Sequence, residues 1–252
     1  MIKTRHSLSD SDIAEAYDRI PHRIGMPPYF YPSVRKFMGE IDGKQVLDAG
    51  CGTGRLLAEL SRGSTAHLYG VDLSHGLLSE ARKRLPASVM LRTANLAEPL
   101  PLDGVFDIIC MTEVMETLKD PVSVIRNLKR HLKDNGEFII TVPNLTAFYP
   151  LYKLASDRLP HKINMLLVPW EHPLGNPQPI DTALEYREIV GLIRDAGLQI
   201  TAVRGYEYLP FLLNMLSPLK KRHLSLDDFL AGRAAHRRAL RVFFKCRHDP
   251  DR

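Results

Sequence analysis

A short apolar run that ends in three closely spaced glycines constrains this chain more than any other feature. The run spans residues 46–54 and reads VLDAGCGTG. Glycine has no Cβ atom, so a turn built from several glycines lets a ligand lie directly against the backbone. The helix expected next, over residues 55–62, offers backbone N–H groups at its first turn. The pattern predicts a ligand-binding turn between the first strand and the first helix of an α/β fold.

Strand-like and helix-like segments alternate on both sides of this turn. Strands are predicted at 45–49, 66–71, 89–93, 106–111, 137–142, 199–203 and 239–246, and helices at 55–62, 77–85, 122–132 and 184–196. Ser74 is a plausible N-cap for the second of these helices. Such alternation is typical of βαβ units. We expect a Rossmann-like, doubly wound, mostly parallel seven-stranded sheet with an antiparallel last strand.

The alternation is interrupted twice, which suggests how one domain of residues 1–252 is organised. Between 144 and 183 the chain carries prolines at 150, 160, 169, 173, 177 and 179, so we expect a helical cap or lid insertion there rather than a core element. A second insertion is expected at 206–238. Residues 1–44 form a leader, 45–143 the ligand-binding core, and 184–252 the C-terminal part of the core.

Composition excludes several classes of protein. Three cysteines form no metal-ligand pattern, which favours a reducing, cytoplasmic setting. We find no stretch of about 18 apolar residues, so we expect no transmembrane helix. The N-terminal residues do not resemble a signal peptide. The apolar segment 209–219 is followed by basic residues, which leaves a peripheral membrane contact open beside the simpler interpretation of a buried helix.

The formal charge of +5 and pI near 9.1 raise the question of nucleic acid. The dense basic groups lie only at 220–223 and 233–241, and few aromatic residues accompany them. A nucleic-acid groove usually interleaves basic and aromatic side chains. We therefore favour solvated helix faces, with an acidic substrate or a membrane surface as the next interpretation, and RNA stays open as an alternative.

Two acidic residues flank the glycine turn. Asp48 ends the first strand, where its charge would repel a pyrophosphate but would suit a ligand with a positive group, and the spacing departs from G-x-G-x-x-G. Asp72 ends the second strand. A carboxylate about 20 residues past the glycine turn can accept hydrogen bonds from both hydroxyls of a ribose. The alternative for Asp72 alone is a helix N-cap or a turn residue.

The segments VLDAGCGTG, GVDLS, FDIICMTEVMETLKDP and LKDNGEFIITVPN, taken in order, resemble the motifs of class I S-adenosylmethionine (SAM)-dependent methyltransferases. The resemblance is greatest to the small-molecule group that includes the ubiquinone-biosynthesis O-methyltransferases. It is specific over 45–144 and weaker over 184–246. It implies SAM as cofactor and S-adenosylhomocysteine (SAH) as product.

The resemblance also implies site residues. Asp48, Gly50 and Gly52 would hold the methionine portion, Asp72 the ribose, and Leu73 the adenine. The full set of implied cofactor-binding residues is Asp48, Gly50, Cys51, Gly52, Gly54, Asp72, Leu73, Asn95, Leu96, Met111 and Glu113. Asn95 replaces the Asp usual in the family, which puts its contact with adenine in doubt. Thr117 replaces a His found in many relatives, so no metal site is expected.

Catalysis requires alignment of the acceptor with the methyl group and at most one general base. His172 is our first candidate for the base and His161 the second, because histidine titrates near neutral pH. Tyr17, Arg23 and Tyr29 of the leader are candidate pocket residues.

We expect methyl transfer to a small-molecule acceptor, most simply at oxygen, with nitrogen and carbon also open. The alternatives are a tRNA or rRNA methyltransferase and a non-catalytic partner subunit that shares the fold. The sequence names neither the acceptor nor the oligomeric state.

Overall fold

The computed structural model describes residues 26, 29–144, 184–206, 237, 239 and 241–251. The described elements, in chain order, are α2 (Phe30–Met38), β1 (Gln45–Ala49), α3 (Arg55–Leu60), β2 (His67–Asp72), α4 (His75–Arg84), β3 (Met90–Thr93), β4 (Phe106–Thr112), the 3-10 helix η3 (Met115–Thr117), α5 (Pro121–Lys129), β5 (Leu132–Pro143), α8 (Tyr186–Asp195), β6 (Leu198–Tyr206) and β7 (Arg241–His248).

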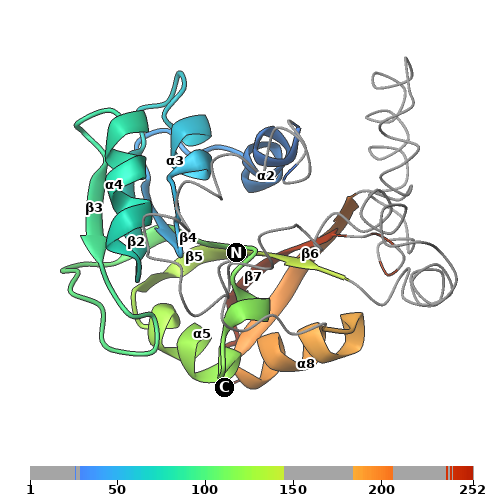
Figure 1. Cartoon of the computed structure of the whole chain (residues 1–252). Coiled ribbons are helices and arrows are strands. Elements are labelled where there is room, and N and C mark those ends of the chain that lie inside the picture. Colours follow the sequence, from blue (N-terminus) through green and yellow to red (C-terminus); the bar gives the residue numbers. More distant parts are fainter. Residues whose placement is uncertain are drawn as a thin grey trace, which may run out of the picture.

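These strands form one seven-stranded sheet in the order β3-β2-β1-β4-β5-β7-β6 (Figure 1). Strands β1 to β5 pair in parallel. Strand β7 lies between β5 and β6 and is antiparallel to both. The predicted fold class, with its antiparallel last strand, is therefore confirmed. The order changes direction at β1, and ligands of open α/β sheets bind at the carboxyl ends of the strands beside such a point.

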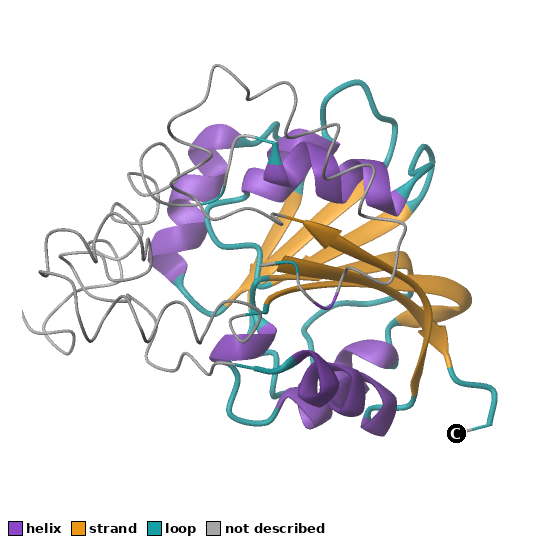
Figure 2. Cartoon of the chain, turned by 90° about the vertical axis from the view of Figure 1, so that its right-hand side faces the viewer, coloured by secondary structure: helices purple, strands orange, loops and turns teal. Residues whose placement is uncertain are grey.

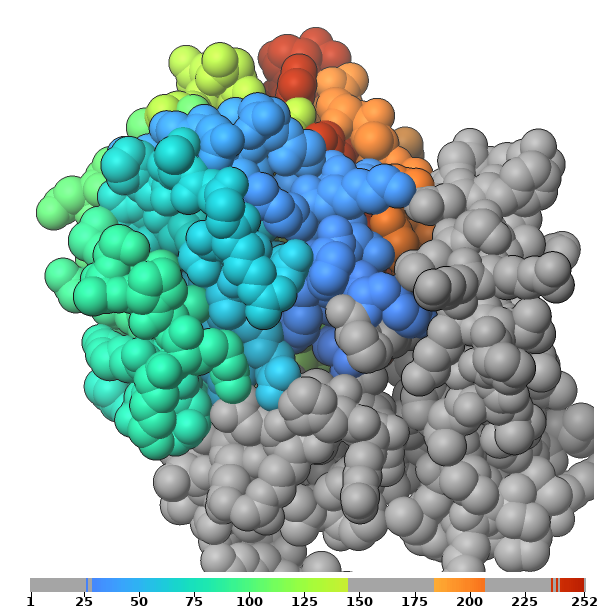
Figure 3. Space-filling view, turned by 90° about the horizontal axis from the view of Figure 1, so that it is seen from above, coloured from blue at the N-terminus to red at the C-terminus, as the bar shows by residue number. Residues whose placement is uncertain are grey.

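Helices cover both faces of the sheet (Figure 2). Helices α2, α3 and α4 lie on one face, where they appear together in Figure 3, and α5 and α8 lie on the other. Side chains of a strand point alternately to the two faces, and the core is divided accordingly. Val46 and Ile108 pack with α2, α3 and α4, whereas Leu47 and Ile109 pack with α5 and α8.

Local signals account for most element boundaries. Strand β1 has the predicted bounds, and the side chain of Ser74 accepts a hydrogen bond from the Leu77 N–H at 3.3 Å, so the predicted N-cap of α4 is confirmed. Helix α5 begins after Asp120, whose side chain accepts from the Ser123 N–H. Gly197, with φ of 76°, follows α8 in the left-handed conformation that favours glycine.

Most element bounds differ from the sequence-based expectation by one to three residues, the 3-10 helix η3 has no counterpart in it, and two differences are larger. Strand β5 begins at Leu132, where we expected helix, and passes through Gly136. A Cβ atom on Gly136 would lie 2.9 Å from the Lys133 carbonyl oxygen, so glycine permits an irregular strand here rather than stopping a helix. Helix α2 was not predicted. Its Pro32 lies in the first turn, where the missing N–H has no helical partner in any case.

Candidate functional site

The glycine turn is fixed to the neighbouring strand by its own backbone. The N–H groups of Gly50 and Cys51 both donate to the Val71 carbonyl oxygen, at 2.8 and 2.9 Å. Gly50, Gly52 and Gly54 have φ of 80°, 51° and 74°. Three residues in the left-handed region within five positions require glycine, because other residues pay a steric cost there.

The three glycines have different surroundings. A Cβ atom on Gly50 would lie 2.5 Å from Val114 Cγ2, and one on Gly54 would lie 2.7 Å from Leu85 Cδ1. A Cβ atom on Gly52 would meet nothing within 4 Å. The side of the turn at Gly52 is therefore open, so a ligand can approach the backbone there.

Asp72 holds the open side of the turn in place. One of its carboxylate oxygens accepts from the Gly52 N–H at 2.8 Å, and the other accepts from the Ser74 N–H at 2.9 Å. Asp72 is the last residue of β2, so its carboxylate lies at the carboxyl ends of the strands, where open α/β sheets bind ligands. Leu73, the next residue, is 68% exposed, which is unusual for a large apolar side chain and offers a flat ligand an apolar surface. Asp72 is not the N-cap of α4, because Ser74 is.

Asp48 is a buried carboxyl with an unsatisfied oxygen. Its side chain is 2% exposed, and Oδ1 has no hydrogen-bond partner among the described residues. Burial, and then repulsion from Asp72, raises the pKa of Asp48 to about 7. A cationic group placed beside this carboxyl would reverse both effects, so Asp48 fits a positively charged ligand.

The carboxyl end of β4 is the next part of the candidate site. Glu113 has φ of 54°, and its carboxylate accepts from Thr141 Oγ1 at 3.0 Å and from Arg241 Nε at 3.1 Å. The Met111 side chain is completely buried on the face of the sheet that α5 and α8 cover, so only the backbone of Met111 lies at the carboxyl end of β4. Glu113 was selected from the sequence, but its partner Arg241 was not.

The remaining predicted cofactor residues lie close by but have structural roles as well. Asn95 accepts from the Ala97 N–H and donates to Glu98 Oε1, so its amide fixes its own turn. Leu96 is 8% exposed. The Cys51 side chain packs in the core below α3, and burial, followed by the charges of two nearby carboxylates, raises the pKa of its thiol.

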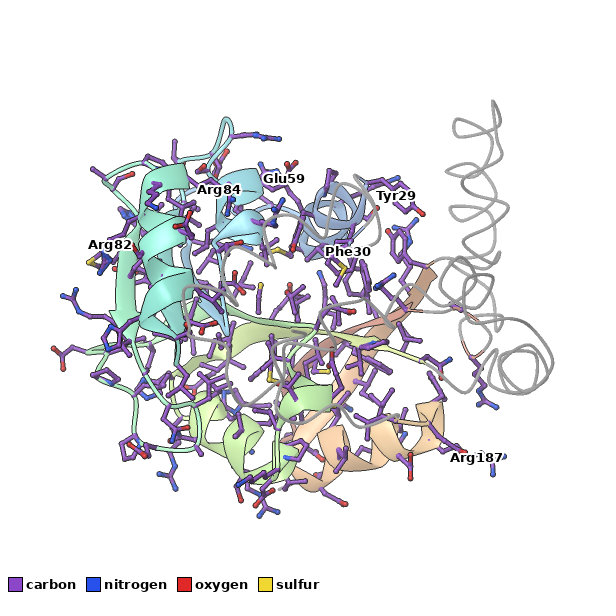
Figure 4. All side chains as sticks on the ribbon, viewed as in Figure 1. Tyr29, Phe30, Glu59, Arg82, Arg84 and Arg187 are labelled. Carbon is purple, nitrogen blue, oxygen red and sulfur yellow. The ribbon has the colours of Figure 1, made fainter. Side chains whose placement is uncertain are left out.

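Sequence reasoning missed part of the site. Tyr31 of α2 is near Arg55, Asp48, Glu113 and Arg241, whose charges all act on its hydroxyl, and burial raises its pKa. The sequence analysis names Tyr29 instead, which lies just before α2 (Figure 4). The apolar spacing of Phe30, Val34 and Met38 predicts the buried face of α2, and it was the available signal for this helix.

Other predictions lie outside the described residues. These are His161, His172, Tyr17, Arg23, the helix over 13–20, nearly all of the insertions at 144–183 and 206–238, and the apolar segment 209–219. Among the described residues, no three His, Cys, Asp or Glu side chains are grouped as a metal would require. In the same part of the chain no helix combines the length and apolar character needed to span a membrane.

The strand order and the acidic glycine turn together define a class, the Rossmann-like SAM-dependent methyltransferases. The comparison with protein families supports this assignment. The family described as "Methyltransferase domain" matches residues 22–203. This range is most of the chain, and the chain belongs to this family.

Curated relatives carry related names. A ubiquinone biosynthesis O-methyltransferase of Ralstonia nicotianae is 32% identical over 172 residues, which are 67% of this chain and 68% of the relative. An enzyme of the same name from Bordetella bronchiseptica is 28% identical over 183 residues, covering 70% and 71% of the two chains.

Solved structures share the fold. A putative methyltransferase of Haloferax volcanii, in complex with the Trm112 activator, has a TM-score of 0.65 at 17% identity and covers 95% of this chain and 96% of its own. The magnesium protoporphyrin IX methyltransferase of Synechocystis, with bound SAH, has a TM-score of 0.55 at 16% identity, covering 94% and 84%. The chain is a SAM-dependent methyltransferase, and SAM is its cofactor.

Proposed function

We propose that the chain methylates an oxygen atom of a small organic acceptor. The observation that carries this proposal is the 32% identity over 172 residues to a ubiquinone biosynthesis O-methyltransferase. That similarity spans two thirds of each chain rather than the cofactor turn alone. The name of the relative indicates O-methylation in ubiquinone biosynthesis, and a phenolic acceptor is therefore our first choice.

We assign the cofactor to the open side of the glycine turn. The residues fit it: the unsatisfied Asp48 oxygen suits the cationic amino acid portion, and the Asp72 carboxylate at the end of β2 suits ribose hydroxyls. The exposed Leu73 suits the adenine ring. Gly50, Cys51, Gly52 and Gly54 contribute backbone. Asn95, Leu96, Met111 and Glu113 complete the set.

Bound SAM supplies an activated methyl group, so the protein has chiefly to align the acceptor and exclude water. We assign these tasks to the leader (1–44) and to the insertions at 144–183 and 206–238. A phenol must also lose its proton, and His172, or failing that His161, is the proposed base. Tyr31, Glu113 and Arg241 lie near one another at the carboxyl ends of β4 and β5.

The test is a panel assay with methyl-labelled SAM. The purified full chain is incubated with phenols of the catechol and quinol type, with carboxylates, with amines and with tRNA. We expect label on a phenolic oxygen, recognised by product mass and by the methoxy signal in NMR spectra.

RNA is the second candidate, favoured by the net charge of +5. Label confined to tRNA, with RNA retention that weakens steeply as salt is raised, would replace the small-molecule proposal. A chain that binds SAH but labels carboxylates or amines alone would contradict the choice of a phenolic oxygen.

A further inference from the structure

The turn after β4 contains an unusual backbone conformation. Glu113 is the one residue other than glycine with positive φ among the described residues, at 54°. A residue with a side chain pays on the order of 1 kcal/mol or more in this region. Some interaction must therefore hold Glu113 there.

Both ends of Glu113 are held. Its backbone N–H donates to the Thr141 carbonyl oxygen at 3.0 Å and lies 3.2 Å from Thr141 Oγ1. Its carboxylate accepts from Thr141 Oγ1 and from Arg241 Nε. The side chains of Arg241 and Glu113 are only 21% and 10% exposed. Water screens this ion pair less than a surface pair, so it constrains the turn more strongly.

Arg241 lies where several segments meet. It is the first residue of β7 and is paired with Pro143, the last residue of β5, and with Tyr206, the last residue of β6. Its guanidinium lies 5.6 Å from the centre of the Phe30 ring at the start of α2. In the sequence, the ends of β5 and β6 are each followed by an insertion, and α2 belongs to the leader.

The turn also contacts the glycine turn. Val114 follows Glu113, and its Cγ2 lies 2.5 Å from the position that a Cβ atom on Gly50 would take. The two turns are thus in direct packing contact. A change in the backbone of Glu113 moves Val114, and a change in Val114 is transmitted to Gly50.

We propose that Arg241 is a positioning residue, which clamps Glu113 in its left-handed conformation and thereby sets the shape of the glycine turn through Val114. The Glu113 carboxylate then serves as an anchor, and Glu113 lines the cofactor site through its backbone.

Calorimetric binding of SAH to the full-length protein tests the clamp without any acceptor. We expect Arg241→Gln to weaken SAH binding about tenfold, which corresponds to about 1.4 kcal/mol, and Arg241→Lys to recover part of the loss. Arg247→Gln is the matched control, because Arg247 is on the same strand and pairs with Glu137 at 2.9 Å. We expect it to change SAH binding by less than twofold.

A second substitution separates an anchor from a ligand. Glycine adopts the left-handed conformation without a clamp. We therefore expect the double variant Arg241→Gln/Glu113→Gly to bind SAH more tightly than Arg241→Gln alone. Two results would rule out a positioning role. One is an SAH affinity of Arg241→Gln equal to that of Arg247→Gln, and the other is a double variant that binds SAH no more tightly than Arg241→Gln alone. A thermal melt of each variant shows whether its weaker SAH binding is caused by unfolding. The Glu113→Gly substitution would not reverse such a loss. A failed acceptor panel would leave these binding results unchanged.

Discussion

At the scale of single residues, Asp48 shows how burial prepares a site for a charged ligand. Few buried carboxyls lack partners, because an unpaired buried charge is costly. Here the empty acceptor position is at the end of β1, beside the glycine turn. The residue that destabilises the ligand-free protein is thus the one that gains most when a cation binds.

Asp48 makes stability depend on pH. Its folded pKa of about 7 is above the ordinary value of 3.8. Its contribution is therefore fully present below about pH 4 and is lost as pH rises through about 7. From pH 5 to pH 8 we expect the free energy of unfolding of the native protein to fall by roughly 2–3 kcal/mol more than that of Asp48→Asn. Urea unfolding at both pH values measures the difference. Parallel pH dependence of the two proteins would refute the burial argument.

Gly50 and Gly52 should fail for different reasons when replaced by alanine. Gly50→Ala combines the left-handed strain with a clash against Val114, so we expect a loss of about 2–5 kcal/mol of stability. Gly52→Ala meets only the strain, about 1–2 kcal/mol, but its methyl group occupies the open side of the turn. We expect the stronger loss of SAH affinity relative to stability in Gly52→Ala. Denaturation measures the stability of each variant, and calorimetry measures its SAH affinity. Normal SAH binding by Gly52→Ala would mean that the cofactor binds at another place.

The proposed base makes a separate prediction. Removing a general base lowers turnover by about 10²–10⁴-fold while leaving cofactor binding intact. We expect His172→Ala to lower kcat on the accepted phenol in this way, with unchanged SAH affinity, and His161→Ala to have a smaller effect. His67→Ala, at the exposed start of β2, is the control. Equal activity of all three variants would exclude a histidine base at either position.

At the scale of elements, helix caps connect local stability to the site. Ser74 caps α4, and its backbone N–H also holds Asp72. Asp120 caps α5, which lies under the opposite face of the sheet. Ser74→Ala and Asp120→Ala should each cost about 1 kcal/mol. Only Ser74→Ala should also weaken SAH binding, because a frayed α4 loosens Asp72. If both variants bind SAH equally well, the cap and the site are independent.

Element boundaries also show what the sequence predicts and what it does not. The bounds of β1, the cap at Ser74 and the alternation of strands with helices follow from local patterns, namely apolar runs, polar caps and glycines. The Glu113–Arg241 contact joins residues 128 positions apart and depends on β7 entering between β5 and β6. No local sequence pattern predicts the Glu113–Arg241 contact or the place of β7 in the sheet. Helix α2 was hidden by prolines, although its apolar spacing was present.

At the scale of the whole molecule, the cofactor should contribute substantially to stability. A ligand at 100 times its Kd stabilises the folded state by about 2.7 kcal/mol. For a domain of this size that corresponds to a rise in Tm of roughly 5–10 °C with SAH. Differential scanning calorimetry checks the value, with adenosine as a partial ligand for comparison. An unchanged Tm at a high SAH concentration would mean that the folded chain does not bind SAH, and would contradict the assigned cofactor site.

The central place of β7 has a consequence for biosynthesis. A ribosome delivers residues 45–206 before residues 241–248, so β5 and β6 are both made while the strand that joins them is still missing. During that interval each exposes an unpaired backbone edge, a template for unwanted association between nascent chains. Cells that make this protein should therefore need chaperone protection of the growing chain until β7 has emerged.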